Sequence, residues 1–202
     1  NMGCMLLIHV TKHLLYLNLS DNFISDAGVA SITSNTHLKI LILNHTLVGD
    51  SLLGKYLAMN NNKTLQTLNV GRHQSAPHSV SDRGFSNLFY SNRALSTFNA
   101  SGHDITRKSL NYLRYHGKLK GANNGQLYHQ QVLLSPQEQH IHLRVLKLND
   151  CGYEIGDAGA ELISQHPFLQ HVELRSAGIK NEGAAYLFAK TFENLEHLDL
   201  GH

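Results

Sequence analysis

The sequence predicts an α/β solenoid: a right-handed horseshoe with a parallel sheet on its concave side and helices on its convex side. Two observations lead to this fold class. First, apolar residues recur at positions 0, +3 and +5 of a unit that repeats along the 202 residues. Second, each copy is followed by a turn, a residue type that favours a helix start, and apolar residues at helical spacing. One strand and one helix have no core of their own, so such units must stack to bury their apolar faces.

The apolar spacing defines the units. Leucine accounts for 33 residues, and units start near residues 14, 38, 65, 95, 143, 169 and 195. The interval from 95 to 143 is 48 residues, twice 24, so we expect a degenerate unit starting near 119 that preserves the stack. The alternative is that this stretch loops out and binds a partner. We treat residues 1–202 as a single domain and, because neither end shows a polar capping unit, as a fragment of a longer array.

Each element of a unit has its own reason. The stretch from 0 to +5 alternates like a short strand with one buried face. Position +8, occupied by Asn22 in the first unit and by Cys151 in a later one, provides a side chain that can bond exposed backbone where the strand turns away. Apolar helical segments follow, as at 27–33, 158–164 and 182–189. We expect their free first-turn N–H groups to be bonded by the preceding polar residues, which are Asp26, Asp50, Asp82, Asp157 and Asn181.

One unit is longer than the others. The third unit reaches its helix start about five residues late, through residues 74–78. We interpret this segment as a surface loop that absorbs an insertion, because loops tolerate extra length. A partner-contact loop at the rim of the sheet is the alternative.

Two segments resemble a known family. Leu-Asn-Leu-Ser-Asp-Asn-Phe-Ile-Ser-Asp-Ala-Gly (17–28) and Ile-Gly-Asp-Ala-Gly-Ala-Glu-Leu (155–162) are similar to leucine-rich repeats of the ribonuclease-inhibitor-like subfamily, and 181–187 is a further copy. The resemblance implies a leucine-rich repeat horseshoe whose concave face docks proteins, although a fold does not by itself fix a function. The Gly-Ala-x-x-Leu helices also look like those of effectors that intracellular bacterial pathogens deliver into host cells. That likeness implies the host cytoplasm as the location.

Composition excludes several classes of protein. The 17 basic and 15 acidic residues leave a net charge of +2, so we expect no nucleic-acid partner. No apolar run reaches the roughly 18 residues of a spanning helix, so we expect no membrane partner either. With only Cys4 and Cys151, the sequence has no disulfide framework, which favours a cytoplasmic location. We interpret both residues as core thiols. Phosphate-loop, zinc-protease and serine-hydrolase motifs are absent, so we do not expect an enzyme. We expect the protein to be a monomer.

The candidate partner-binding residues are the side chains that a strand presents to the concave side. Tyr16, Ile40 and Ile42 form an apolar spot near the N-terminal end. Aromatic and arginine side chains are the usual energetic anchors of interfaces, so Tyr16, Arg72 and Arg175 are the leading anchors. The full candidate set is Tyr16, Asn18, Ile40, Ile42, Asn69, Arg72, Asn99, Lys147, His171, Glu173, Arg175 and His197.

Histidine, present 15 times, raises the question of metal binding. His171 and His197 share one unit position, with Glu173 and Asp199 beside them, and these residue types suit zinc. A second group comprises His129, His140 and His142. Repetition brings identical residue types together without any function, so the sequence alone assigns no metal and no cofactor.

The sequence therefore predicts a non-catalytic module that binds a protein partner through its concave face, with little backbone entropy lost on binding. The resemblance leaves two alternatives open. One family with this repeat type activates small GTPases, which would require catalytic residues on the loops that follow the strands. The other alternative is the substrate-receptor arm of a ubiquitin ligase.

Overall fold

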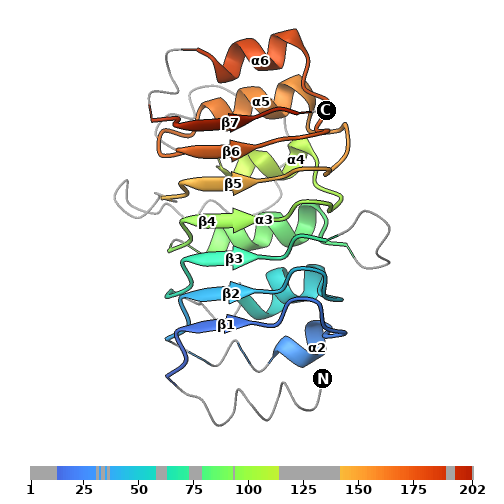
Figure 1. Ribbon diagram of the computed structural model, residues 1–202, viewed down its shortest axis with the longest axis vertical. Coiled ribbons are helices and arrows are strands. Elements are labelled where there is room, and N and C mark those ends of the chain that lie inside the picture. Colours follow the sequence, from blue (N-terminus) through green and yellow to red (C-terminus); the bar gives the residue numbers. More distant parts are fainter. Residues whose placement is uncertain are drawn as a thin grey trace, which may run out of the picture.

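The computed structural model describes residues 13–30, 32, 35, 37–57, 63–72, 79–92, 94–113, 142–189 and 194–201. Seven parallel strands form one sheet in sequence order, and the helices lie together on one side of it (Figure 1). The strands are β1 (Tyr16–Asn18), β2 (Ile40–Ile42), β3 (Thr67–Asn69), β4 (Thr97–Asn99), β5 (Val145–Lys147), β6 (His171–Glu173) and β7 (His197–Asp199). The helices are α2 (Asp26–Val29), π-helical η2 (Ser51–Leu57), α3 (Asp82–Ser91), α4 (Arg107–Leu110), 3₁₀-helical η3 (Asn111–Leu113), α5 (Gly156–Ser164) and α6 (Asn181–Leu187).

The strands follow the predicted alternation. The central residue of each inner strand, such as Leu41, Leu68 or Phe98, is fully buried beneath the helices, while its two neighbours are partly exposed on the opposite face. Phe98 packs edge-on against Phe85 and Phe89 of α3, with ring centroids 5.3 Å apart in both pairs. The predicted fold class, a parallel sheet backed by helices in a solenoid, is confirmed.

β4 and β5 are neighbours in the sheet, although the longest interval between unit starts separates them in the sequence. β4 pairs directly with β5, in the register Thr97↔Val145 and Asn99↔Lys147, while its other edge pairs with β3. Both edges of β4 are therefore occupied by described strands, and the degenerate unit that we expect near residue 119 lies outside the described part of the chain.

The aspartates at the helix starts couple neighbouring units. We expected them to bond the first turn of their own helices, but their carboxylates accept N–H groups from the next unit along the chain. Asp50 accepts the N–H of Ser81 through Oδ1 and its hydroxyl through Oδ2, both at 2.6 Å. Helices α3 and α4 are instead capped by Ser81 and Thr106, whose side-chain oxygens accept the N–H groups of Arg83 and Lys108. Equivalent bonds join Asp26 to Gly49, Asp82 to Thr106, and Asp157 to Lys180 and Gly183.

Gly183, two residues after the start of α6, leaves room for the carboxylate of Asp157. A Cβ added at Gly183 would lie 2.9 Å from the Cα of Asp157 and would also collide with Asp157 Oδ1, so backbone has to move. We expect Gly183→Ala to lower the free energy of unfolding by about 2 kcal/mol, because overpacking outweighs the gain in helix propensity. Urea denaturation checks this, with Ala185→Ser at an exposed position of α6 as the control. Equal stability of the two variants would contradict the close approach.

At position +8, the side chains of Asn22, Thr46 and Cys151 each donate to a backbone carbonyl. Asn22 Nδ2 donates to the carbonyls of Leu19 and Ser20, at 3.2 and 2.8 Å. The Thr46 hydroxyl donates to Leu43 O at 2.7 Å. The Cys151 thiol donates to Ala100 O at 3.2 Å, and burial raises its pKa to about 12, so it is the core thiol that we expected.

Several sequence-based expectations fall on residues outside the described part of the chain. These are the thiol of Cys4, the loop at 74–78, the residues 114–141 that include the degenerate unit, and His129 and His140 of the second histidine group. His142 of that group lies at the start of the β5 unit, where its ring packs against Phe168 with centroids 4.9 Å apart.

Candidate functional site

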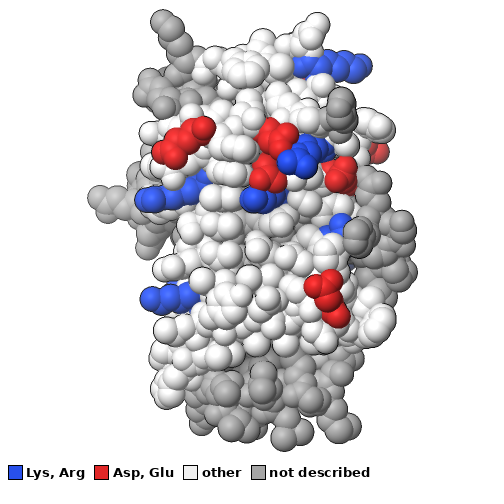
Figure 2. Space-filling view, in the orientation of Figure 1, with Lys and Arg blue, Asp and Glu red and all other residues white. Residues whose placement is uncertain are grey.

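The open face of the sheet is the side turned away from the helices, where positions +2, +4 and +6 of each unit lie. It divides into two parts. The neutral half, over β1–β4, has no Lys, Arg, Asp or Glu at these positions, which hold Tyr16, Asn18, Ser20, Ile40, Ile42, Asn44, Thr67, Asn69, Gly71, Thr97, Asn99 and Ser101. The charged half, over β5–β7, holds Val145, Lys147, Asn149, His171, Glu173, Arg175, His197, Asp199 and Gly201. Charged side chains gather over β5–β7 and are confined to the margins over β1–β4 (Figure 2).

The neutral half combines an apolar spot with ordered amides. Tyr16 is 51% exposed, and its register partner Ile40 is partly exposed, as is Ile42 beside Asn18. Parallel pairing holds these three side chains on adjacent strands, about 4.8 Å apart. Asn18 Oδ1 accepts the N–H of Ser20, and Asn99 makes the same bond to Ser101, both at 3.0 Å. These two asparagines are therefore fixed in place by the turn that ends each strand.

The carboxylate of Glu173 lies at the centre of the charged half. Glu173 Oε1 lies 2.7 Å from Lys147 Nζ and 2.8 Å from His171 Nε2, and Oε2 accepts the Asn149 amide at 2.7 Å. Burial alone raises the pKa of Glu173, but the hydrogen bonds from Lys147, His171 and Asn149 outweigh it and lower the pKa to about 2. Glu173 therefore stays ionised below the pH at which a free carboxyl group takes up its proton.

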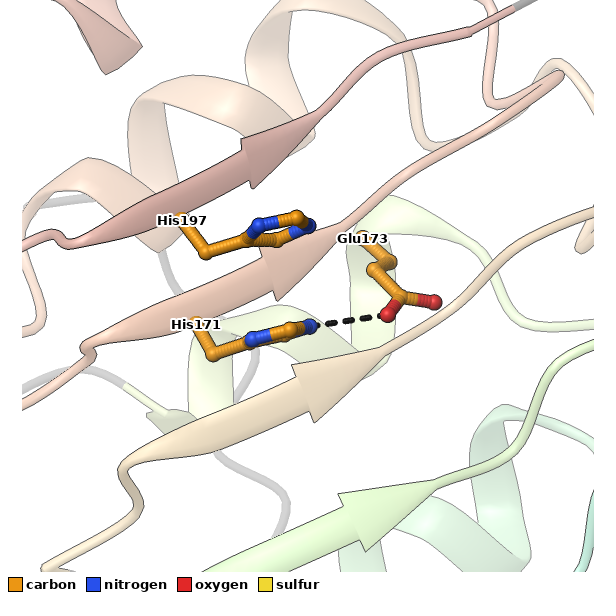
Figure 3. Close-up of side chains that lie close together, drawn as sticks. All are labelled: His171, Glu173 and His197. Carbon is orange, nitrogen blue, oxygen red and sulfur yellow. Dashed lines mark hydrogen bonds and ion pairs between the residues drawn. The ribbon is translucent and has the colours of Figure 1, made fainter.

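A second pair and a ring stack complete the charged half. Arg175 Nε and one terminal nitrogen both lie 2.6 Å from Asp199 Oδ2. The imidazoles of His171 and His197 stack with centroids 4.0 Å apart and planes 14° from parallel (Figure 3). Each formal charge at the open positions of this half thus faces an opposite charge, because Lys147 pairs with Glu173 and Arg175 with Asp199.

Of the predicted binding residues, all but one lie at open positions of the sheet. The exception is Arg72, whose side chain is only 6% exposed and lies 3.6 Å from Asp104 Oδ2, on the loop that follows β4. It is therefore not an exposed anchor on this face. Arg175 remains exposed on the face, although its guanidinium is already engaged by Asp199.

Two features of the site were missed from the sequence. The pairing of Lys147 with Glu173 follows from their shared +4 position in adjacent units, a signal that the repeat alignment contained. A second recurring residue lies three positions before the unit start, where Asn35 and Asn92 each accept two backbone N–H groups through Oδ1 and His166 accepts one through Nδ1. These side chains shape the entry into the next strand, and a backward extension of the alignment would have found them.

Comparison with family models finds leucine-rich repeats in three segments of the chain. Residues 11–32, 139–164 and 165–188 match a family model described as Leucine Rich repeat. The chain is also similar to a solved structure of the Leiomodin-1 Actin-Binding Site 2 (ABS2), with 14% sequence identity and a TM-score of 0.46 over 95% of this chain and 87% of that chain. No curated protein sequence gives a significant match. The family model shows that leucine-rich repeats are present, and with the seven-stranded parallel sheet the fold is an α/β leucine-rich repeat solenoid. Within the described ranges, no helix combines the length and apolarity needed to cross a membrane.

Proposed function

We propose that this protein is a non-catalytic interaction module that binds a protein partner on the neutral half of its open face. The observation that carries the proposal is the apolar spot of Tyr16, Ile40 and Ile42, exposed on a rigid sheet next to fixed amides. The presence of leucine-rich repeats supports an interaction module. The unit lengths and the helices behind the sheet support the finer assignment to ribonuclease-inhibitor-like repeats.

Electrostatics favours the neutral half over the charged half as the centre of contact. Covering the neutral half desolvates no ionised group at an open position, whereas covering the charged half desolvates four charges that already satisfy one another. Interfaces draw most of their energy from a few aromatic and apolar anchors near their centre, surrounded by polar contacts. Tyr16 with Ile40 and Ile42 fits the centre of such a contact, and the amides of Asn18, Asn69 and Asn99 fit its surroundings.

We expect the triple variant Tyr16→Ser, Ile40→Thr, Ile42→Thr to weaken partner binding by about 100-fold or more, since loss of two or three anchors costs at least about 3 kcal/mol. Threonine keeps the β-branched side chain that a strand favours, so the sheet is retained. The measurement is affinity capture from cell lysate with mass spectrometry, followed by titration of the captured partner against wild type and variant.

The matched control is Tyr153→Ser, Phe188→Ser, which removes two side chains that are 81% and 74% exposed and lie outside the strands. Circular dichroism verifies that both variants are folded. A partner lost from the triple variant but kept by the control supports the neutral half as the binding surface. A partner kept by the triple variant, or lost equally from both, contradicts it.

A further inference from the structure

The charged half brings three metal-ligand side chains together. His171 on β6 and His197 on β7 are register partners, and Glu173 lies two residues further along the same face of β6. One ligand atom from each of the three side chains lies within 4.8 Å of the other two (Figure 3). The sequence placed the two histidines at one unit position, but it did not show that Glu173 approaches His171 to 2.8 Å.

We propose that His171, Glu173 and His197 bind a divalent transition metal of the zinc type on the open face. Two imidazole nitrogens and one carboxylate oxygen form a ligand set that zinc accepts, with solvent completing the coordination. All three side chains are at least partly exposed, so an ion has a direct path to them. The site does not depend on the partner surface proposed above.

The surroundings of Glu173 support a built site. Asn149 holds Oε2 at 2.7 Å, an outer bond of the kind that orients carboxylate ligands at metal sites. Asn149 is itself held, because its Oδ1 accepts the backbone N–H of Arg175 at 2.9 Å. Glu173 therefore presents Oε1 in a fixed direction, toward His171.

Glu173 Oε1 already forms an ion pair with a cationic side chain. Lys147 Nζ lies 2.7 Å from Oε1, so a metal ion takes the place of an ammonium group instead of adding charge to an empty position. The Lys147 side chain is 33% exposed and has a flexible stem, which lets its ammonium group move into water. Asp199 is not among the proposed ligands, because Arg175 holds it with two contacts of 2.6 Å.

The two imidazoles have to leave their stack to share one ion, since parallel rings direct their lone pairs along parallel lines. This needs only side-chain rotation, because the register of β6 and β7 already places the two residues side by side. His197 is exposed and can turn without disturbing the core. The backbone is thus in place before binding, and forming the site requires movement only of the side chains of His171, His197 and Lys147.

The test is calorimetric titration of the full chain with Zn²⁺. We expect one site whose affinity falls by about tenfold or more in each of His171→Asn, His197→Asn and Glu173→Gln. Lys147→Met should bind Zn²⁺ more tightly than wild type, because it removes the competing ammonium. His45→Asn changes another exposed histidine, at a backbone φ of 55° that asparagine tolerates, and should bind as wild type does.

A second measurement locates the ion without relying on affinity. The imidazole ¹⁵N resonances of His171 and His197 should shift together on addition of Zn²⁺. Zinc affinity that is unchanged in His171→Asn and His197→Asn would place the ion on other histidines and overturn the proposal. An affinity unchanged in Lys147→Met, or a shift in only one of the two imidazoles, would also overturn it.

Discussion

Asp50→Ala is expected to lower the free energy of unfolding by about 3 kcal/mol. The carboxylate makes two bonds of 2.6 Å, to the N–H and the hydroxyl of Ser81. Hydrogen bonds to a charged group are each worth about 1.5–3 kcal/mol, and their loss leaves two donors of the next unit unsatisfied. The Ser81 hydroxyl also caps α3 through the N–H of Arg83, so the damage reaches the following helix.

Urea denaturation followed by circular dichroism measures this loss. Asp50→Asn keeps an acceptor for the Ser81 N–H without the charge and should lose about 1 kcal/mol. Glu196→Ala removes an exposed carboxylate and should stay within about 0.5 kcal/mol of wild type. In a solenoid each unit contacts only its neighbours, so amide exchange should accelerate first in the units next to residue 50. Equal losses for Asp50→Ala and Glu196→Ala would show that the carboxylate does not couple the units.

Periodicity was enough to predict the fold, because a spacing of 0, +3 and +5 says which side of a strand is buried. It was not enough to predict hydrogen-bond partners. Asp157 stands at the expected helix start, yet it bonds Lys180 and Gly183, 23 and 26 residues away. A pattern gives the place of a residue within its unit, whereas the geometry of stacking decides which unit it contacts.

The candidate site shows the same division. Positions +2 and +4 were correctly predicted to lie on one face, since side chains alternate along a strand. The place of Arg72 was not predicted correctly, because its side chain is buried and pairs with Asp104. Arg72 lies at +7, beyond the strand, where alternation no longer fixes the direction of a side chain.

His103 shows how a substitution within the repeat changes the chemistry of a unit. It occupies position +8, is 2% exposed, and bridges two backbone groups of the preceding unit. Its Nδ1 accepts the N–H of Val80 at 2.9 Å, so the proton lies on Nε2, which donates to Val70 O at 2.6 Å. Burial lowers the pKa of His103 from 6.5 to about 4, although the bond to Val70 acts in the opposite direction.

Acid is therefore expected to destabilise the protein through this one imidazole. The charged groups near His103 are Asp50, Arg72 and Asp104. In the folded protein His103 takes up a proton only near pH 4, whereas in the unfolded chain it does so near pH 6.5. The unfolded state binds more protons in this window, so the free energy of unfolding is highest above pH 6.5 and should fall by about 2 to 3 kcal/mol by pH 4.5.

Urea denaturation at pH 7.5 and 4.5, compared between wild type and His103→Asn, isolates this contribution from the other histidines. Asparagine occupies the same unit position at Asn22 and does not titrate. His103→Asn should therefore lose about 2 to 3 kcal/mol less stability than wild type on acidification, even if it is less stable than wild type at pH 7.5. The exposed His45→Asn should keep the wild-type dependence. If the stability of His103→Asn falls with pH as much as that of wild type, His103 takes up its proton at the same pH in the folded and unfolded states. That result would contradict a buried imidazole fixed between two backbone groups.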